Sequence, residues 1–193
     1  MARAARRSDP DRREKIIAAT LDLIAARGVQ GATYRTVGAA ADVPLGSMTY
    51  YFPSREDLVF TAFERFADEL FSPLDRSMTD VGPGEDPRER LVRMVVADDR
   101  DRQRDMVLLA ELYVLAFRQE RYAELMRQWM RRARAAIARY LPSASAPVID
   151  AVQEGLAWQR ALLPDDYTED VVRRTLHALI ENPSPTHEER RPE

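Results

Sequence analysis

A short run of hydrogen-bonding side chains lies near the start of the chain. Residues 46–51, GSMTYY, follow a proline and form a segment that is too short and too polar to be a core helix. Their hydroxyl groups can both donate and accept hydrogen bonds. We therefore expect this segment to be held against a hydrogen-bonding partner, and double-stranded DNA is the obvious candidate.

Two short helices and a tight turn are predicted to position these groups. Thr33 can cap the first helix, because its hydroxyl can accept a hydrogen bond from a free N–H in the opening turn. Asp42 falls in the turn, where the backbone needs a residue that tolerates positive φ, and Pro44 prevents the first helix from continuing. The pattern is typical of a helix-turn-helix.

A longer helix precedes this pair and is expected to complete a three-helix bundle. It is predicted to run from Pro10 or Asp11 to Arg27, because apolar residues recur at helical spacing and Gly28 lies just past its end. The core of the bundle should contain Ile17, Leu21, Ile24, Val37, Ala41, Val43 and Phe52.

The fourth helix is predicted to begin after Ser54, which opens a capping-box pattern that ends at Asp57. Its apolar side chains recur at helical spacing and should point inward; they are Val59, Phe63, Phe66 and Leu70. A helix that starts in the N-terminal bundle and ends in a second module would link the two mechanically.

Helical patterns continue through the rest of the chain, and strand signals are nearly absent. Two breaker segments, Asp80–Pro87 and Pro142–Pro147, interrupt the pattern. Further helices are predicted at Arg88–Asp101, Met106–Phe117, Glu120–Tyr140, Val148–Leu162 and Thr168–Ile180. The fold class is therefore predicted to be all-α with about nine helices, and the tail Asn182–Glu193 is expected to be disordered.

Composition bounds the class of protein. Of the 193 residues, 45% are hydrophobic, so the chain can bury a substantial core. It contains no cysteine, which excludes disulfides and thiol catalysis. Residues 1–13 are basic and polar with no apolar run behind them, and no apolar stretch approaches the length of a membrane span. We expect a soluble, cytoplasmic protein without a membrane partner.

Charge is distributed unevenly along the chain. The net charge is −3, but residues 1–60 hold nine basic and seven acidic side chains, whereas the remainder holds 20 and 25. Basic side chains concentrate at the very start, at Arg3, Arg6, Arg7, Arg12, Arg13 and Lys15. This cluster is either a solvated tail or an arm that reaches a DNA groove or its phosphates.

Catalytic and metal-binding patterns receive little support. The two histidines, His177 and His187, have no metal-ligand partner at helical spacing, and Ser47 lacks the glycine pattern of a nucleophile elbow. The acidic residues between 98 and 105 alternate with arginines, which favours a self-paired surface over a cation site. We therefore expect no enzyme activity, no catalytic residue, no metal and no cofactor.

The segment from Thr33 to Leu58 resembles the DNA-binding region of the TetR family of bacterial transcription regulators. Residues that match the family pattern in register are Thr33, Val37, Ala41, Val43, Gly46, Ser47, Met48, Tyr51, Phe52, Ser54, Arg55, Glu56 and Leu58. Four residues depart from the usual pattern. Asp42 stands in place of Gly, Pro44 in place of Ser, Thr49 in place of Tyr, and Arg55 in place of Lys. The last change keeps the charge that meets phosphate.

The resemblance implies a ligand-responsive repressor that binds a near-palindromic operator as a homodimer. The residues then expected to contact DNA are Thr33, Arg35, Leu45, Gly46, Ser47, Thr49, Tyr50, Tyr51 and Arg55. Leu45, Gly46 and Thr49 are expected to face base edges, whereas most of the others should contact phosphates. A helical adaptor that has lost operator binding and keeps only protein partners is the alternative.

Met and aromatic residues in the second half of the chain admit two interpretations. They either form ordinary core or line a pocket for a small apolar or amphipathic effector. The resemblance raises the chance of a pocket, for which the candidates are Met94, Tyr113, Phe117, Met126, Trp129 and Met130.

The last two predicted helices carry a stripe with small and polar members, which would permit close helix approach. Packing within one chain explains the stripe nearly as well as a homodimer interface does. The family resemblance favours the homodimer. The residues are Val148, Val152, Gly155, Gln159, Leu162 and Leu176. The expected organisation is a DNA-binding domain at 1–55, an effector-binding and dimerisation domain at 56–181, and a disordered tail at 182–193.

Overall fold

The structure, a computed structural model, describes residues 10–79, 85–97 and 102–181. These residues contain helices and no strand, which confirms the all-α prediction. None of the helices within these ranges is both long enough and apolar enough to cross a membrane. Residues 80–84 of the predicted breaker segment Asp80–Pro87 and the predicted tail at 182–193 lie outside the described residues.

Nine α-helices and one 3-10 turn account for most of the described chain. They are α1 (Pro10–Gly31), α2 (Tyr34–Ala40), α3 (Leu45–Tyr51), α4 (Arg55–Ser77), α5 (Pro87–Val96), α6 (Arg102–Ala116), α7 (Glu120–Ile137), the 3-10 turn η1 (Ser143–Ser145), α8 (Ala146–Leu162) and α9 (Glu169–Glu181).

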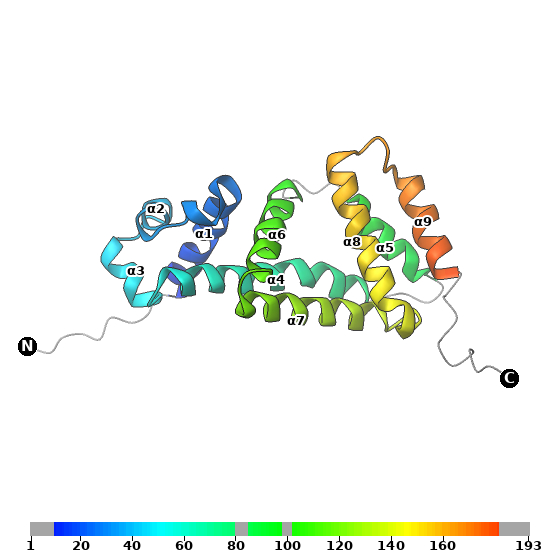
Figure 1. Cartoon of the computed structure of the whole chain (residues 1–193), viewed down its shortest axis with the longest axis horizontal. Helices are drawn as coiled ribbons and strands as arrows, with labels where there is room; N and C mark the ends of the chain where they lie inside the picture. The colour runs from blue at the N-terminus through cyan, green and yellow to red at the C-terminus, as the bar shows by residue number, and fades with distance from the viewer. Residues whose placement is uncertain (1–9, 80–84, 98–101, 182–193) are drawn as a thin grey trace, which may run out of the picture.

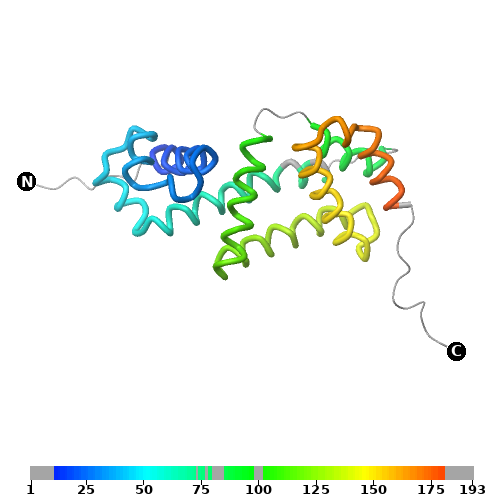
Figure 2. The backbone as a smooth tube through the Cα atoms, turned by 45° about the horizontal axis from the view of Figure 1, so that its top comes forward, coloured from blue at the N-terminus to red at the C-terminus, as the bar shows by residue number. Residues whose placement is uncertain are grey.

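The molecule is elongated, with a small head at one end and a larger body at the other (Figure 1). Helices α1, α2 and α3 form the head, and α4 runs out of it along the length of the body. Helix α7 packs against α4, and α6 packs against both α7 and α1. Helices α5, α8 and α9 pack together at the far end, as the turned view in Figure 2 also shows.

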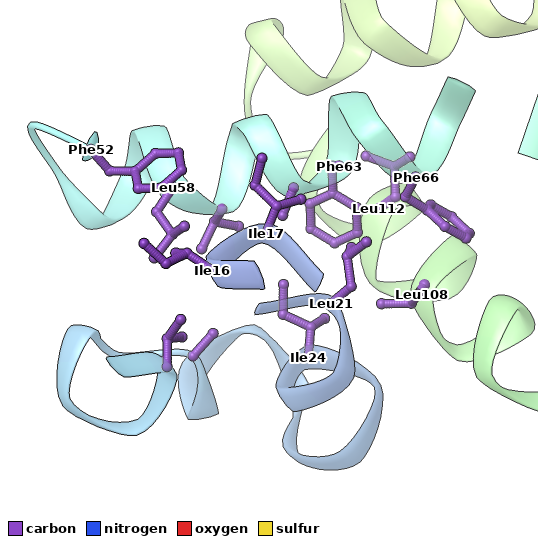
Figure 3. Close-up of a cluster of buried hydrophobic side chains, with 14 of the residues drawn as sticks. Ile16, Ile17, Leu21, Ile24, Phe52, Leu58, Phe63, Phe66, Leu108 and Leu112 are labelled. Atoms are coloured by element: carbon purple, nitrogen blue, oxygen red, sulfur yellow. The ribbon is translucent and has the colours of Figure 1, made fainter. Parts of the chain in front are cut away.

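A continuous hydrophobic core joins the head to the near part of the body. Ile17, Leu21 and Ile24 of α1 face the aromatic ring of Phe63 on α4 and the side chain of Leu112 on α6 (Figure 3). Six of the seven predicted core residues of the head are buried, and Ala41 packs at the edge of the core, partly exposed. The head therefore rests on the body through apolar contacts.

A second core fills the far part of the body. Its buried side chains come from α4, α5, α7, α8 and α9 and include Phe71, Leu91, Ile137, Ile149, Val172 and Leu176. Of the inward stripe predicted for α4, Val59, Phe63 and Phe66 are buried in the first core, and Leu70 packs partly buried against it. Because α4 contributes to both cores, it connects them rigidly.

The connection between α5 and α6 differs from the prediction. Helix α5 ends at Val96 and α6 begins at Arg102, so the first is shorter and the second longer than the sequence pattern indicated. The guanidinium of Arg102 donates hydrogen bonds to the carbonyl oxygens of Met94 (3.1 Å) and Val95 (2.7 Å). This contact satisfies two of the free carbonyls at the end of α5.

The turn between α2 and α3 has the predicted geometry. Asp42 has φ 53°, the one positive φ of a non-glycine residue within the described ranges. The amide of Val43 donates to the carbonyl of Gly38 (2.8 Å), and a Cβ at Gly38 would lie 2.9 Å from the carbonyl oxygen of Val43. Gly38 therefore allows the chain to fold back closely on α2.

Both predicted helix caps are present. The Thr33 hydroxyl accepts from the amide of Thr36, and the Thr36 hydroxyl accepts in return from the amide of Thr33, which forms a full capping box. At the start of α4, the Ser54 hydroxyl accepts from the amide of Asp57 (3.0 Å) and donates to its carboxylate (2.7 Å).

The positive φ of Asp42 leads to a test of the turn. Because Asp42 is exposed, a substitution there changes backbone strain and leaves the core intact. Asp42→Val should destabilise the protein by about 1–2 kcal/mol, since β-branched residues resist this conformation. Asp42→Gly should stay within about 1 kcal/mol of the wild type. Urea unfolding with an unchanged m-value measures the free energy of unfolding of both variants. Equal stability of the two variants would contradict a positive φ at residue 42.

Candidate nucleic-acid interface and ligand cavity

Helix α3 presents an outward face that its own packing leaves uncovered. Met48 is fully buried and anchors the helix, while Leu45, Gly46, Thr49 and Tyr50 are exposed. Tyr50 is 63% exposed, unusual for a large aromatic side chain. A seven-residue helix held by one buried side chain is positioned to present the remaining residues to a partner.

The other residues predicted to contact DNA divide into two groups. Thr33 and Arg35, on the neighbouring α2 segment, are exposed. Ser47 and Tyr51 are half-buried, and the ring of Tyr51 packs edge-on against that of Tyr50 with centroids 5.1 Å apart. The exposed residues lie on α2, on its N-cap and on α3, and these two helices pack against each other.

Arg55 has a structural role that the sequence pattern did not indicate. It is half-buried, and its guanidinium donates from Nε to the carbonyl oxygen of Ala32 (2.8 Å) and from Nη2 to that of Val29. These hydrogen bonds tie the first turn of α4 to the connection between α1 and α2. A phosphate contact by Arg55 stays a prediction, and Arg35 is the better placed cation because it is exposed.

Tyr34 makes a second tie that sequence reasoning missed. Its phenol donates to the carbonyl oxygen of Phe52 (2.6 Å) and so joins the start of α2 to the end of α3. Burial, together with the nearby carboxylates of Asp57 and Glu56, raises the pKa of Tyr34, which keeps the phenol neutral and able to donate. The two helices are therefore fixed relative to each other by polar contacts as well as by the core.

Two cavities lie beside α8 in the body, and the same two carboxylates line both. The first has a volume of about 620 Å³ and the second about 460 Å³, within the range of small-molecule pockets. Residues lining the first are Ala110, Tyr113, Met130, Arg134, Asp150, Ala151, Glu154, Gly155 and Trp158. Asp150 and Glu154 are the shared wall.

Hydrogen bonds organise the polar groups of the first cavity. The phenol of Tyr113 donates to Oε1 of Glu154 (2.6 Å), and the indole N–H of Trp158 donates to the same oxygen (3.4 Å). Nε of Arg134 pairs with the buried carboxylate of Asp150 (3.0 Å). Burial raises the pKa of Asp150, against the opposing effect of Arg134, and burial with the Glu154 contact raises that of Tyr113.

Four of the six residues predicted to form an effector pocket line these cavities. Tyr113 and Met130 line the first, and Met94 and Trp129 line the second. The prediction was wrong for Phe117, which lies at the end of α6 with 88% of its surface exposed. Met126 lines neither of these two cavities and is buried in the core shared with the head, so its pocket role stays a prediction.

The charged residues of the cavity were not among the predicted pocket residues. Asp150 and Glu154 stand four positions apart on α8, so they share one face of a helix that is otherwise mainly apolar. Carboxylates at this spacing within an apolar helix were the available signal. Arg134 belongs to α7, and only the fold brings it to Asp150.

The predicted dimer stripe lies mostly on the outside of α8. Val148, Gly155 and Gln159 are exposed, Val152 is partly buried, and Leu162 is 77% exposed. The prediction was wrong for Leu176, which is 0% exposed, because α9 turns this side chain into the second core beside α5 and α8.

His177 and the acidic residue Asp105, for which no catalytic role was predicted, make ion-pair and hydrogen-bond contacts with nearby side chains. His177 of α9 contacts Glu89 of α5 (2.8 Å), and the same carboxylate pairs with Arg173 (3.1 Å). The described ranges hold no group of three side chains that could bind a metal ion. Most of the acidic run predicted to be self-paired lies outside them, and Asp105, inside them, pairs with Arg104.

Comparison with known proteins agrees with this arrangement. The family described as bacterial regulatory proteins, tetR family, matches residues 16–62, which cover most of α1 and all of α2 and α3. The repressor KstR of Rhodococcus jostii is 36% identical over 107 residues, 55% of this chain and 48% of its own length. The chain thus spans about half the length of the curated relatives it matches.

Solved structures match over nearly the whole chain. SCO1917 of Streptomyces coelicolor A3, a member of the TetR family, is 30% identical, with a TM-score of 0.76 over 89% of this chain and 99% of its own. The multidrug binding protein EbrR is also 30% identical, with a TM-score of 0.73 over 93% of this chain and 99% of its own. The head, the long α4 and the helical body are thus shared with TetR regulators, and the chain belongs to the TetR family of transcriptional regulators.

Proposed function

We propose that this regulator is a ligand-responsive repressor that binds a near-palindromic operator as a homodimer in the cytoplasm. The observation that carries the proposal is the exposed face of α3, held on a rigid head by Met48 and by the ties from Tyr34 and Arg55. Exposed hydroxyl and backbone groups on a short helix suit a major groove. Thr33, Arg35, Leu45, Gly46, Thr49 and Tyr50 are the proposed contact surface.

The repressor assignment is supported by relatives whose names carry that function. KstR, which aligns with 55% of this chain, is named as a repressor. EbrR, which aligns with nearly all of it, has been solved with imidazole, proflavin and ethidium. These similarities favour a regulator with a small-molecule effector over an enzyme.

Helix α6 supports coupling between the cavity and the head. Ala110 and Tyr113 of α6 line the 620 Å³ cavity, and Glu111 between them approaches the kink of α1. At that kink Gly28 has φ 68°, and a Cβ there would lie 3.0 Å from Oε1 of Glu111. A ligand that shifts α6 would press on α1 and so change the spacing of the two heads in a dimer.

A homodimer is proposed through the outer face of α8. Val148 and Leu162 present apolar side chains to solvent, with the small Gly155 and the polar Gln159 exposed on the same helix, and a second copy would cover them. Two heads would then reach half-sites about one helical turn, roughly 34–36 Å, apart.

The operator itself provides the direct experiment. A fluorescence-anisotropy titration with the DNA that flanks the gene should give specific, salt-dependent binding. A helical adaptor that keeps only protein partners would bind this DNA no better than an unrelated fragment at any salt concentration. That result would end the repressor proposal.

Arg35 and Arg55 form a matched pair for testing how the head meets phosphate. Arg35→Ala should weaken binding to all DNA sequences alike and reduce the slope of log affinity against log salt by about 0.9. Its stability should stay within about 0.5 kcal/mol of the wild type, because the side chain is exposed. Titrations at several salt concentrations measure the slope.

Arg55→Ala should act mainly on stability. The change leaves the carbonyls of Val29 and Ala32 without their charged donor. The free energy of unfolding, measured in urea, should therefore fall by about 1–3 kcal/mol. If Arg55→Ala instead kept the stability of the wild type and lowered the slope of log affinity against log salt by about one unit, Arg55 would contact phosphate and would have no structural role.

Gly155 tests the dimer at a position where its own chain leaves room for a larger side chain. A Cβ at Gly155 meets no atom within 4 Å in its own chain, so Gly155→Leu should fold normally. In a dimer through α8 the leucine should raise the dissociation constant at least about tenfold, ~1.4 kcal/mol. Sedimentation measures the dimer, and Ala135→Leu, on the exposed side of α7, is the control. If Gly155→Leu dimerises as well as the control, the interface lies elsewhere.

A further inference from the structure

We propose that the 620 Å³ cavity binds a monovalent organic cation, with its positive charge at Glu154 between the rings of Tyr113 and Trp158. This inference deepens the proposed function and rests on it, because it names the chemical class of the effector. The argument depends on the charges, hydrogen bonds and apolar walls of the cavity itself.

The charged groups of the cavity leave one negative charge uncompensated. Its ionisable side chains besides Tyr113 are Arg134, Asp150 and Glu154. Arg134 and Asp150 neutralise each other through their ion pair. Glu154 has no cationic partner within the described ranges, and its hydrogen bonds come from the neutral groups of Tyr113 and Trp158. A carboxylate that is partly withdrawn from water without a counter-charge favours a cationic ligand.

The hydrogen-bond geometry leaves one oxygen of Glu154 available. Both Tyr113 and Trp158 donate to Oε1, and no described residue donates to Oε2. Because Oε1 has two donors, the carboxylate is held in place, and Oε2 can meet a ligand. A fixed acceptor on the cavity wall is pre-organised for a positive group and repels an anion.

The two rings add a second source of attraction for a cation. Tyr113 and Trp158 are held beside the carboxylate by the same hydrogen bonds, and both line the cavity. The face of an indole or phenol ring attracts a positive charge, by about 0.5–2 kcal/mol according to how dry the site is. A carboxylate flanked by two aromatic rings therefore selects a diffuse organic cation over a small hydrated ion.

The rest of the wall is small and apolar, which sets the character of the ligand body. Ala110, Met130, Ala151 and Gly155 complete the lining. The apolar body of a ligand can pack against these residues. The expected effector is an apolar or aromatic cation rather than a sugar or a metal ion.

A pair of ions with one shape and opposite charge separates charge from size. Tetraphenylphosphonium and tetraphenylborate share four phenyl groups around one atom. Calorimetric titration of the full chain should give an affinity for the phosphonium at least about tenfold above that for the borate. The chain has two tryptophans, so Trp129→Phe leaves Trp158 as the sole fluorescent reporter, and the phosphonium should quench it.

Glu154→Gln tests the residue that carries the proposal. Glutamine keeps the shape and the acceptor for Tyr113 and Trp158 but removes the charge, so phosphonium affinity should fall at least about tenfold. Glu64→Gln changes the net charge equally at an exposed position of α4 and should leave binding unaltered. Circular dichroism establishes that each variant is folded.

Tyr113→Phe separates charge from positioning. It keeps the ring and removes one donor to Glu154, so phosphonium binding should persist or strengthen if the carboxylate acts by its charge. If Glu154 served only to hold the ring, Tyr113→Phe would lose affinity as Glu154→Gln does. That result would overturn the proposal.

Three further results would overturn the cation site. Equal affinity for the two ions, no phosphonium binding at millimolar concentration, or wild-type affinity in Glu154→Gln would each overturn the cation site. Release of the operator is measured separately with the same ion. Phosphonium that binds through Glu154 but leaves operator affinity unchanged would support the cation site and count against the regulatory role.

Discussion

The packing of α1 against α4 and α6 is the contact on which the rest of the structure depends. Ile17, Leu21 and Ile24 are buried against Phe63 and the leucines of α6, so the head and body share one core. Burial of each such side chain contributes about 1.5–3 kcal/mol, which makes independent motion of the head costly. The shared core therefore links α4 and α6 of the body to the head that carries α3.

Hydrogen bonds from Arg55 and Tyr34 fix the orientation of the head helices more closely than the shared hydrophobic core does. Arg55 binds the α1–α2 connection to the start of α4, and Tyr34 binds α2 to the end of α3. Apolar packing is not directional, whereas these hydrogen bonds are, so they set the angle at which α3 presents its exposed residues. The positive φ of Asp42 does the same for the turn.

The body combines a stable frame with a mainly apolar cavity that holds a few charged groups. Its far core, built from five helices, supports α8 from one side, and the carboxylates of α8 stand at the wall between two cavities. Asp150 is neutralised by Arg134, whereas Glu154 is held by two neutral donors. That difference gives the cavity a charge that a ligand can complement, next to the helix that contacts the head.

Local patterns determined the helices, the turn and the outward face of α3, because spacing, caps and the tolerance of Asp42 for positive φ act over a few residues. Contacts between distant segments were decided by the tertiary structure. Sequence spacing could not reveal that Arg55 would meet Val29, that Leu176 would turn inward, or that Phe117 would lie outside. Periodicity assigns a residue to a face of its helix, but only the packed fold decides whether that face meets core, cavity or solvent.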